Sequence, residues 1–255
     1  MNKYRHPKEY LAMALVFGIL GLFTLVLSFI TFGVGFLLVV AGIVWLYIKV
    51  LRKSELDFYV YIDVEKDRAL TKLVEALARK WKLGEIEIYL NPVREVNSVP
   101  ADFGKDFIIL NQGMLDAIPG ERHRRFVLGH ELGHAGLWHG WLHKLDYYVD
   151  HFHQDTFIQK AFDLFTQDYL DTLEYSADRI GLISCNNLKA AMESVVFIEV
   201  GQSDRSYEEI AKAVVYLSTG KSARNRKVRQ VFSDHPKVYD RIYELTEFAR
   251  EMKMV

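Results

Sequence analysis

The stretch from Tyr10 to Ile48 contains no charged side chain, and it constrains the fold of this chain more than any other feature. A single helix over it would be about 60 Å long, roughly twice the hydrocarbon thickness of a bilayer. Two helices of about 20 residues each fit better, and the glycine-containing residues 31–35 mark the place where the chain turns. We therefore predict a transmembrane hairpin with helices over Tyr10–Ile30 and Phe32–Val50.

Two alternatives exist for this apolar stretch. A cleaved signal peptide would explain the basic residues before it, but the apolar part is too long and no small-x-small cleavage site follows it. A pair of buried core helices would explain its length, but both segments are apolar on all sides, which favours lipid as their surrounding. The membrane hairpin is the interpretation that we carry forward.

The residues that flank the hairpin predict its orientation. Lysine and arginine occur on both sides of it, whereas the connecting turn has no charge, so both ends are expected on the cytoplasmic side of the cell membrane or inner membrane. Residues 1–53 then form the anchor, and residues 54–255 form a cytoplasmic domain. The basic flanking residues are Lys3, Arg5, Lys8, Lys49, Arg52 and Lys53, and the aromatic residues expected near the interface are Tyr4, Tyr10, Trp45 and Tyr47.

The overall composition limits the class of protein. Half of the 255 residues are apolar, which is enough for one sizeable core, and the net charge of -1 gives no reason to expect nucleic acid as a partner. Cys185 is the only cysteine, so an intrachain disulfide is excluded, which fits a reducing compartment.

The part after the hairpin is expected to be an α+β domain, mostly helical with a small sheet. Residues 57–64 are rich in aromatic and β-branched types and suggest a short strand, and "EIEIYL" and "DFIILN" suggest two more. Apolar residues at helical spacing predict a helix over 66–82. A second helix is expected from about Glu121 to Trp141, after a Pro-Gly break, and residues 142–253 are expected to be mostly helical.

The sequence "LGHELGHAGLWH", residues 128–139, places imidazole and carboxylate groups inside an apolar helical run. His130 and His134 are four residues apart, so their rings lie on one face of a helix and can both reach one zinc ion. Glu131 lies beside them and can take a proton from the attacking water as a general base. The alternative is a chance match on a solvated helix face. Three glycines lower the helix propensity here and suggest the close approach of another element or of a substrate; they are Gly129, Gly133 and Gly136.

A zinc site of this kind needs a third protein ligand. The metzincin continuation is excluded, since it needs glycine at position 137 and histidine at position 140, and the chain has Leu137 and Gly140. His139 and His143 would continue the helix and rotate away from the metal face, so a structural or surface role is expected for them. The sequence "LEYSADRIG" offers Glu174 and Asp178, four residues apart on a predicted helix: one carboxylate can bind the metal and the other can hold a ligand histidine by its second ring nitrogen.

Three motifs together resemble a known family. "HELGHAGLWH" followed by "EYSAD" is similar to the HtpX-like membrane zinc metallopeptidases, which are glutamate zincins related to the CAAX prenyl proteases. The run "NSVPADFGKDFIILNQGMLDAIPGERHRRFVLG" resembles the strands before their catalytic helix, and "SDHPKVYDRI" resembles their His-Pro element. The resemblance covers roughly residues 66–250. Members often have further transmembrane helices before the third ligand, whereas residues 141–172 of this chain are too polar to span a bilayer.

The resemblance implies zinc-dependent hydrolysis of peptides, with one zinc ion per chain. It implies His130, His134 and Glu174 as metal ligands, Glu131 as the base, and Asp178 behind a ligand.

The resemblance also implies roles for two further residues. Asn97 falls where the family has a substrate-contacting asparagine; a turn-capping asparagine is the alternative. His235 either donates a hydrogen bond in the cleft, blocks the open position of the metal, or is merely exposed in a capping loop.

Two other segments are candidates for substrate or membrane contact. The strand "DFIILN" is a candidate exposed edge onto which a peptide adds as a further strand. An aromatic stripe is expected to be either core or an amphipathic lid against the cleft or the membrane. His151 and His153 are expected at the surface. The stripe consists of Trp138, Trp141, Tyr147, Tyr148, Phe152, Phe157, Phe162 and Phe165.

The sequence therefore predicts a membrane-anchored zinc endopeptidase that cleaves membrane or misfolded proteins at the cytoplasmic face. Its partners would be a polypeptide substrate and the lipid bilayer. The rival functions are a non-catalytic membrane-tethered zinc-binding scaffold or chaperone-like protein, and a metal-dependent hydrolase of another substrate class.

Overall fold

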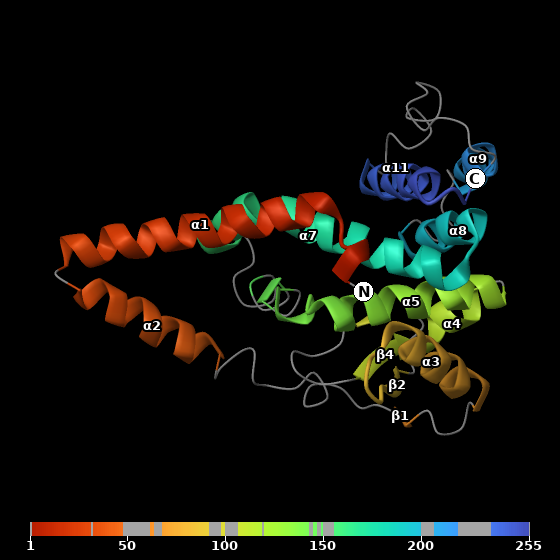
Figure 1. Cartoon of the computed structure of the whole chain (residues 1–255), viewed down its shortest axis with the longest axis horizontal. Helices are drawn as coiled ribbons and strands as arrows, with labels where there is room; N and C mark the ends of the chain where they lie inside the picture. The colour runs from red at the N-terminus through yellow and green to blue at the C-terminus, as the bar shows by residue number, and fades with distance from the viewer. Residues whose placement is uncertain are drawn as a thin grey trace.

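Two apolar helices at the N-terminus project from a body made of further helices and one small sheet (Figure 1). The structure is a computed structural model, and it describes residues 2–31, 33–47, 62–63, 68–91, 98–99, 107–118, 120–142, 145–146, 149, 156–199, 207–218 and 236–254.

The first apolar helix, α1, spans Pro7–Ile30, after a short 3-10 helix over Asn2–Tyr4. The second, α2, spans Val34–Leu46, which is shorter than the predicted Phe32–Val50; residues 48–50 lie outside the described residues. The turn between them is where the glycines predict it. Gly33 has a φ of 91°, in the left-handed region that favours glycine, and it precedes α2 directly.

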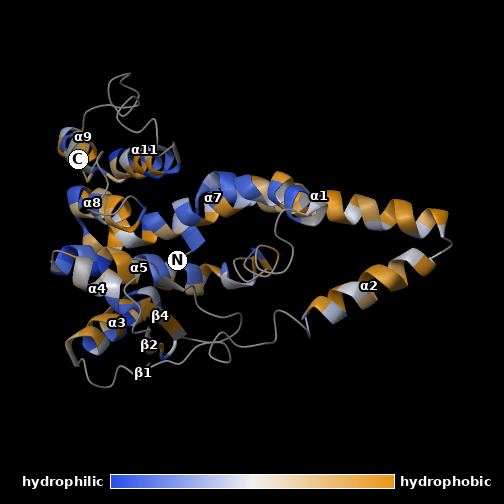
Figure 2. Ribbon diagram, turned by 180° about the vertical axis from the view of Figure 1, so that it is seen from behind, coloured by the Kyte–Doolittle hydropathy of each residue, from blue (hydrophilic) through white to orange (hydrophobic). Residues whose placement is uncertain are grey.

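Among the described residues one helix, α1, is long and apolar enough to cross a membrane, and α2 is a shorter apolar helix. The first half of α1 packs against the body, where Ala12, Met13 and Val16 join a cluster of buried side chains. Its second half and α2 consist mainly of hydrophobic residues (Figure 2), and many of their apolar side chains are exposed. Phe29, for example, is 88% exposed. This apolar surface has the composition that a lipid environment requires.

The sheet has four described strands in the order β1-β2-β4-β3. The central pair is parallel, with Glu87 of β2 opposite Phe107 of β4, and the two short outer strands are antiparallel to their neighbours. Strand β4 is therefore paired on both sides. The expectation that "DFIILN" forms an exposed edge is wrong, because β3 covers its outer side at Ile109 and Leu110. The strands are β1 Ile62–Asp63, β2 Glu87–Asn91, β3 Ser98–Val99 and β4 Phe107–Asn111.

The helices of the body enclose the core together with the sheet. The central helix, α5, lies between the sheet on one side and α7 and α8 on the other (Figure 1). Phe126 and Leu132 of α5 are fully buried, as are Ile108 and Leu110 of β4. The helices are α3 Arg68–Trp81, α4 Gln112–Ala117, α5 Glu121–Leu137, α7 Phe157–Cys185, α8 Leu188–Glu199, α9 Tyr207–Ser218 and α11 Pro236–Glu251.

The predicted aromatic stripe divides between two environments. Trp141 and Phe162 pack with α1 and α7 in the cluster around Leu142, whereas Trp138 is 68% exposed. The structure gives no description of the side chains of the other members. Residues 143–144, 147–148 and 150–155, which include His143, His151 and His153, lie outside the described residues.

The N-terminal segment, residues 2–9, packs against the body rather than standing apart from it. The ring of Tyr4 lies edge-on to that of Trp81, with centroids 5.4 Å apart. His6 is buried, and its Nε2 lies 2.8 Å from a carboxylate oxygen of Glu244 in α11. A boundary at residue 53 therefore separates groups that are in contact with each other.

Helices α5 and α7 approach each other closely at glycines. A Cβ at Gly133 would lie 3.0 Å from the Cα of Ala177, and a Cβ at Gly129 would lie 2.5 Å from the Cβ of Ser184. The second distance is far below van der Waals contact. The close approach of α7 thus explains why α5 has glycine at these two positions despite its low helix propensity. The sequence predicts such an approach for Gly129 and Gly133.

We expect Gly129→Ala to lower the thermal unfolding temperature of the full chain in detergent. The added methyl forces α5 away from α7, and overpacking of this kind costs about 1–3 kcal/mol. The alanine also gains up to about 1 kcal/mol of helix propensity, but the contact at 2.5 Å from the Cβ of Ser184 outweighs this gain. Gly42→Ala is the control, because a Cβ there meets no described atom within 4 Å. Equal stabilisation by both variants would contradict the close-packing argument.

Candidate metal centre

The closely packed pair α5 and α7 brings together the three predicted metal ligands. His130 and His134 lie one turn apart on α5, and Glu174 faces them from α7. The two Nε2 atoms are 3.0 Å apart, and each lies 3.4 Å from a carboxylate oxygen of Glu174. One potential ligand atom from each residue lies within 4.8 Å of the others. Both histidines are buried, whereas the side chain of Glu174 is 26% exposed.

The other ring nitrogens of the two histidines also have partners. His130 Nδ1 lies 2.9 Å from Asp178 Oδ1, which accepts its proton, and His134 Nδ1 lies 3.0 Å from His139 Nδ1. A neutral imidazole has one N–H and one lone pair. When both protons are on Nδ1, two Nε2 lone pairs point at each other across 3.0 Å beside a carboxylate. A cation between them removes that repulsion, and two nitrogens with one oxygen are a donor set that suits zinc.

The charges around His130 lead to the same conclusion. Burial lowers its pKa, but Asp178 and Glu174 raise it more, to about 10. Without a metal the site therefore holds a proton on His130 at neutral pH, which means that the surrounding carboxylates stabilise a positive charge there. A divalent cation that displaces this proton meets the same carboxylates.

Arg241 of α11 fixes both carboxylates. Its Nε donates to Asp178 Oδ2 at 2.8 Å and its Nη2 donates to Asp178 Oδ1 at 2.6 Å, a bidentate pair, while its Nη1 lies 3.2 Å from Glu174. Burial raises the pKa of Glu174 and of Asp178, but nearby positive charges, Arg241 among them, outweigh it and hold both below their ordinary values. Nη1 also donates to Glu199 Oε1 at 2.6 Å. Both carboxylates are therefore ionised and held in place by the same side chain.

The predicted base, Glu131, follows His130 directly in α5. Its side chain is only 3% exposed. The structure thus places it inside the body, one residue after His130.

His139 does not lie where the sequence predicts. Helix α5 ends at Leu137, not near Trp141, because Trp138 takes a left-handed conformation with a φ of 65°. The chain then folds back, so His139 is 1% exposed and its ring meets His134. The expectation that it rotates away from the metal face is wrong, whereas a structural role for it fits this position. Burial lowers its pKa, so the ring is neutral at pH 7.

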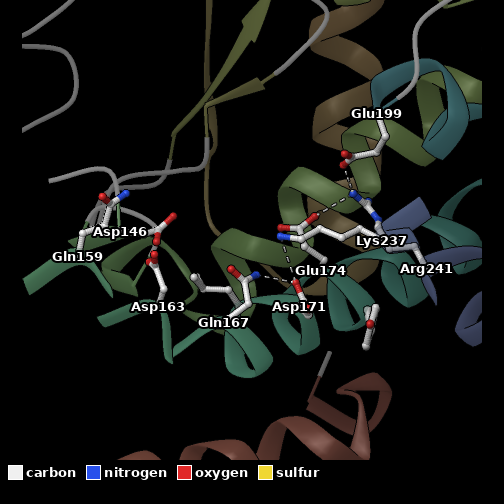
Figure 3. Close-up of a pocket in the computed structure, with 11 residues that line it drawn as sticks. Asp146, Gln159, Asp163, Gln167, Asp171, Glu174, Glu199, Lys237 and Arg241 are labelled. Atoms are coloured by element: carbon white, nitrogen blue, oxygen red, sulfur yellow. Dashed lines mark hydrogen bonds and ion pairs between the residues drawn. The ribbon is translucent and has the colours of Figure 1, made fainter. Parts of the chain in front are cut away.

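A cavity of about 390 Å³ opens onto Glu174 (Figure 3). Arg241 and Glu199 line it at one end, and the side chains of α7 line it towards Gln159. Lys237 lies 3.8 Å from Asp171 at its rim. Glu174 belongs both to the ligand cluster and to the cavity wall, so the cavity reaches one of the three potential ligands.

Two predicted site residues lie outside the described residues. Asn97 directly precedes β3, and His235 directly precedes α11. Two other residues belong to the site or its surroundings but were assigned no role from the sequence: Arg241, and Glu9 at the start of α1, which lies 3.3 Å from His139. The sequence did contain an indication of Arg241, since this residue is the arginine of the "YDRI" sequence in the His-Pro element.

Comparison with known proteins gives one match. Searches of curated proteins and of solved structures found nothing that matches the chain. A family model matches residues 65–158, which contain α3, β2, β4 and α5. The match ends before Glu174 and Asp178. Over residues 65–158 the chain matches the family model of peptidase family M48, and this match supports a metallopeptidase of that family.

Proposed function

We propose that the protein is an HtpX-like zinc endopeptidase, held in a membrane by its N-terminal helices, that hydrolyses peptide bonds. The observation that carries the proposal is the convergence of His130, His134 and Glu174, whose potential ligand atoms lie within 4.8 Å of one another. The match to peptidase family M48 over the region of α5 supports the same chemistry.

In this proposal the two Nε2 atoms and the carboxylate of Glu174 would hold one zinc ion. A zinc ion bound there would polarise the carbonyl of the scissile peptide. Glu131 takes a proton from the attacking water and delivers it to the leaving amine. Asp178 keeps the proton of His130 on Nδ1 and so leaves Nε2 free as a ligand. His235 and Asn97 stay predictions: a hydrogen bond to the developing oxyanion and a contact to the substrate backbone.

The membrane part of the proposal rests on α1 and α2. Their projecting halves expose apolar side chains that a soluble surface would not gather in this number. The charge distribution of the flanking residues favours a cytoplasmic location for the body. Substrates would then be membrane proteins or misfolded chains that reach this face, and the cavity beside Glu174 would admit their extended segments.

The test is hydrolysis of fluorescent casein by the full chain in detergent. We expect cleavage that ortho-phenanthroline, a zinc chelator, abolishes and that added zinc restores, because the ligands bind zinc only reversibly. The meta isomer does not chelate and is the control for effects of the aromatic compound itself.

Three outcomes separate the competing functions. Cleavage that responds only to the chelating isomer supports the peptidase. Stoichiometric zinc binding with no cleavage of casein or of unfolded membrane proteins favours the zinc-binding scaffold. Cleavage that survives complete removal of the metal contradicts the proposed mechanism.

A further inference from the structure

Glu9 is a carboxylate on the apolar helix α1 that is completely buried, with 0% exposure. It lies in the first turn of the helix, two residues after Pro7, just before the uncharged stretch begins. An ionised carboxylate without partners is very costly to bury, so its surroundings in the body are informative.

Three polar groups surround this carboxylate, one from the N-terminal segment, one from α7 and one from the residues after α5. Arg5 and the hydroxyl of Ser176 on α7 both donate to it. The third neighbour is His139, whose Nε2 lies 3.3 Å from Glu9 Oε1. Arg5 in turn donates to the carbonyl oxygen of Leu137, the last residue of α5, at 2.9 Å. The start of α1 is thus attached to the end of the helix that carries the two histidine ligands.

His139 connects Glu9 to the metal centre. Its Nδ1 lies 3.0 Å from His134 Nδ1, and its Nε2 faces Glu9. For His134 to bind a metal through Nε2, its proton must be on Nδ1, and His139 must then accept it with a lone pair on Nδ1. The remaining proton of a neutral His139 is consequently on Nε2, the nitrogen that lies 3.3 Å from Glu9 Oε1. The three groups therefore allow one consistent arrangement of protons when a metal is bound.

We propose that Glu9, through His139, is a positioning residue for the metal ligand His134, so that the anchoring helix α1 forms part of the metal centre. The inference rests on the proposed function insofar as that function assigns a metal to this site. His134 thereby has an outer partner equivalent to the one that Asp178 provides for His130. If α1 left its position on α7, the carboxylate of Glu9 would no longer lie beside His139, and His134 would lose this indirect support.

The N-terminal segment also has attachments that do not involve this path, which provide a control. Glu244 of α11 lies 2.8 Å from the Nε2 of His6 and 2.9 Å from the Nζ of Lys8. Glu244→Gln weakens the attachment of the segment without touching Glu9, His139 or His134. A merely structural role of Glu9 predicts similar effects of the two glutamine variants on the metal centre, whereas the positioning role predicts different ones.

The experiment measures the zinc affinity of full-length variants in detergent by competition with a chromophoric chelator. We expect Glu9→Gln to weaken zinc binding by roughly 10–100-fold, as is typical of outer partners of ligand histidines, and Glu244→Gln to change it by less than about threefold. The absorption spectrum of the cobalt-substituted protein should shift in Glu9→Gln and stay unchanged in Glu244→Gln, because the orientation of the His134 ring affects the ligand field.

A second variant tests the path itself. In His139→Asn the amide oxygen can accept the proton of His134 without help from Glu9, so Glu9→Gln should have no further effect on zinc affinity in this background. If Glu9→Gln alone fails to fold, His139→Ala replaces it, with the same expected loss of affinity and the same spectral shift.

The outcomes also separate this inference from the proposed function. Wild-type affinity and spectrum in Glu9→Gln, or an equal loss in Glu244→Gln, would overturn the positioning role and leave the peptidase untouched. A chain whose zinc affinity depends on Glu9 as expected, but which cleaves no peptide, would overturn only the peptidase. A wild-type chain that binds no zinc would overturn both.

Discussion

Replacing Glu131 with glutamine is expected to lower the rate of peptide hydrolysis by at least about 10²–10⁴-fold, the usual contribution of a general base. Glutamine has nearly the same shape, so the buried position remains filled and the packing of α5 against α7 is kept. The ligands His130, His134 and Glu174 are unchanged, so zinc affinity should stay within a few-fold of that of the wild type. The amide cannot accept the proton of the attacking water, so the change removes the general base.

The measurement is casein cleavage together with zinc content after dialysis. Glu121→Gln is the matched control, since Glu121 is on the same helix, is 71% exposed and pairs with Arg125 at the surface. Its activity should equal that of the wild type. Retention of more than about a tenth of the turnover by Glu131→Gln would refute the assignment of the base.

Part of the metal centre could be predicted from the sequence because it depends on local geometry. Two histidines four residues apart on a helix share a face whatever surrounds the helix, so their joint role needs no knowledge of the fold. Glu174 is different: it lies on another helix, and although its spacing from Asp178 made both residues candidates, only the resemblance to a family assigned Glu174 to the metal. The approach of α7 to α5 at Gly129 and Gly133 is what realises that connection in space.

The rest of the site depends on contacts that have no local signal. Helix α5 ends at Leu137 because Trp138 adopts a left-handed conformation, a position where glycine or asparagine is usual. A tryptophan does not predict a helix end, so the sequence does not indicate that His139 contacts His134. The contact between Glu9 and His139 has no signal in the sequence, since the two residues are distant in the chain. A charged residue before an apolar helix also resembles an ordinary flank of a membrane helix.

The sheet shows the same distinction between local and distant determinants. The β-branched and alternating segments indicated β2 and β4 within a few residues of their observed bounds. Whether a strand lies at an edge depends on its partners, however, and the two-residue strand β3 is too short to predict from its composition. Its pairing with Ile109 and Leu110 occupies the side of β4 that we expected to be free.

Glu174→Ala is expected to remove zinc from the protein and to abolish hydrolysis with it. Two histidines and solvent then have to hold the ion, so the loss of affinity should exceed the roughly 10–100-fold that is typical of a change behind a ligand. The variant also removes the carboxylate oxygen that lies 3.2 Å from Arg241 Nη1. Arg241 nevertheless keeps its bidentate pair with Asp178 and its hydrogen bond to Glu199. The body should therefore remain folded, and circular dichroism of the variant checks this.

Glu199→Ala distinguishes a lost ligand from a disturbed charge network. Glu199 lines the same cavity and binds the same Nη1 of Arg241, but it does not belong to the cluster of potential ligands. Its replacement perturbs Arg241 and the charge of the cavity as Glu174→Ala does, without removing an oxygen from the metal position. Zinc content should therefore fall only in Glu174→Ala. Full zinc occupancy in that variant would mean that the third ligand is another residue, and equal losses in both variants would assign the effect to Arg241.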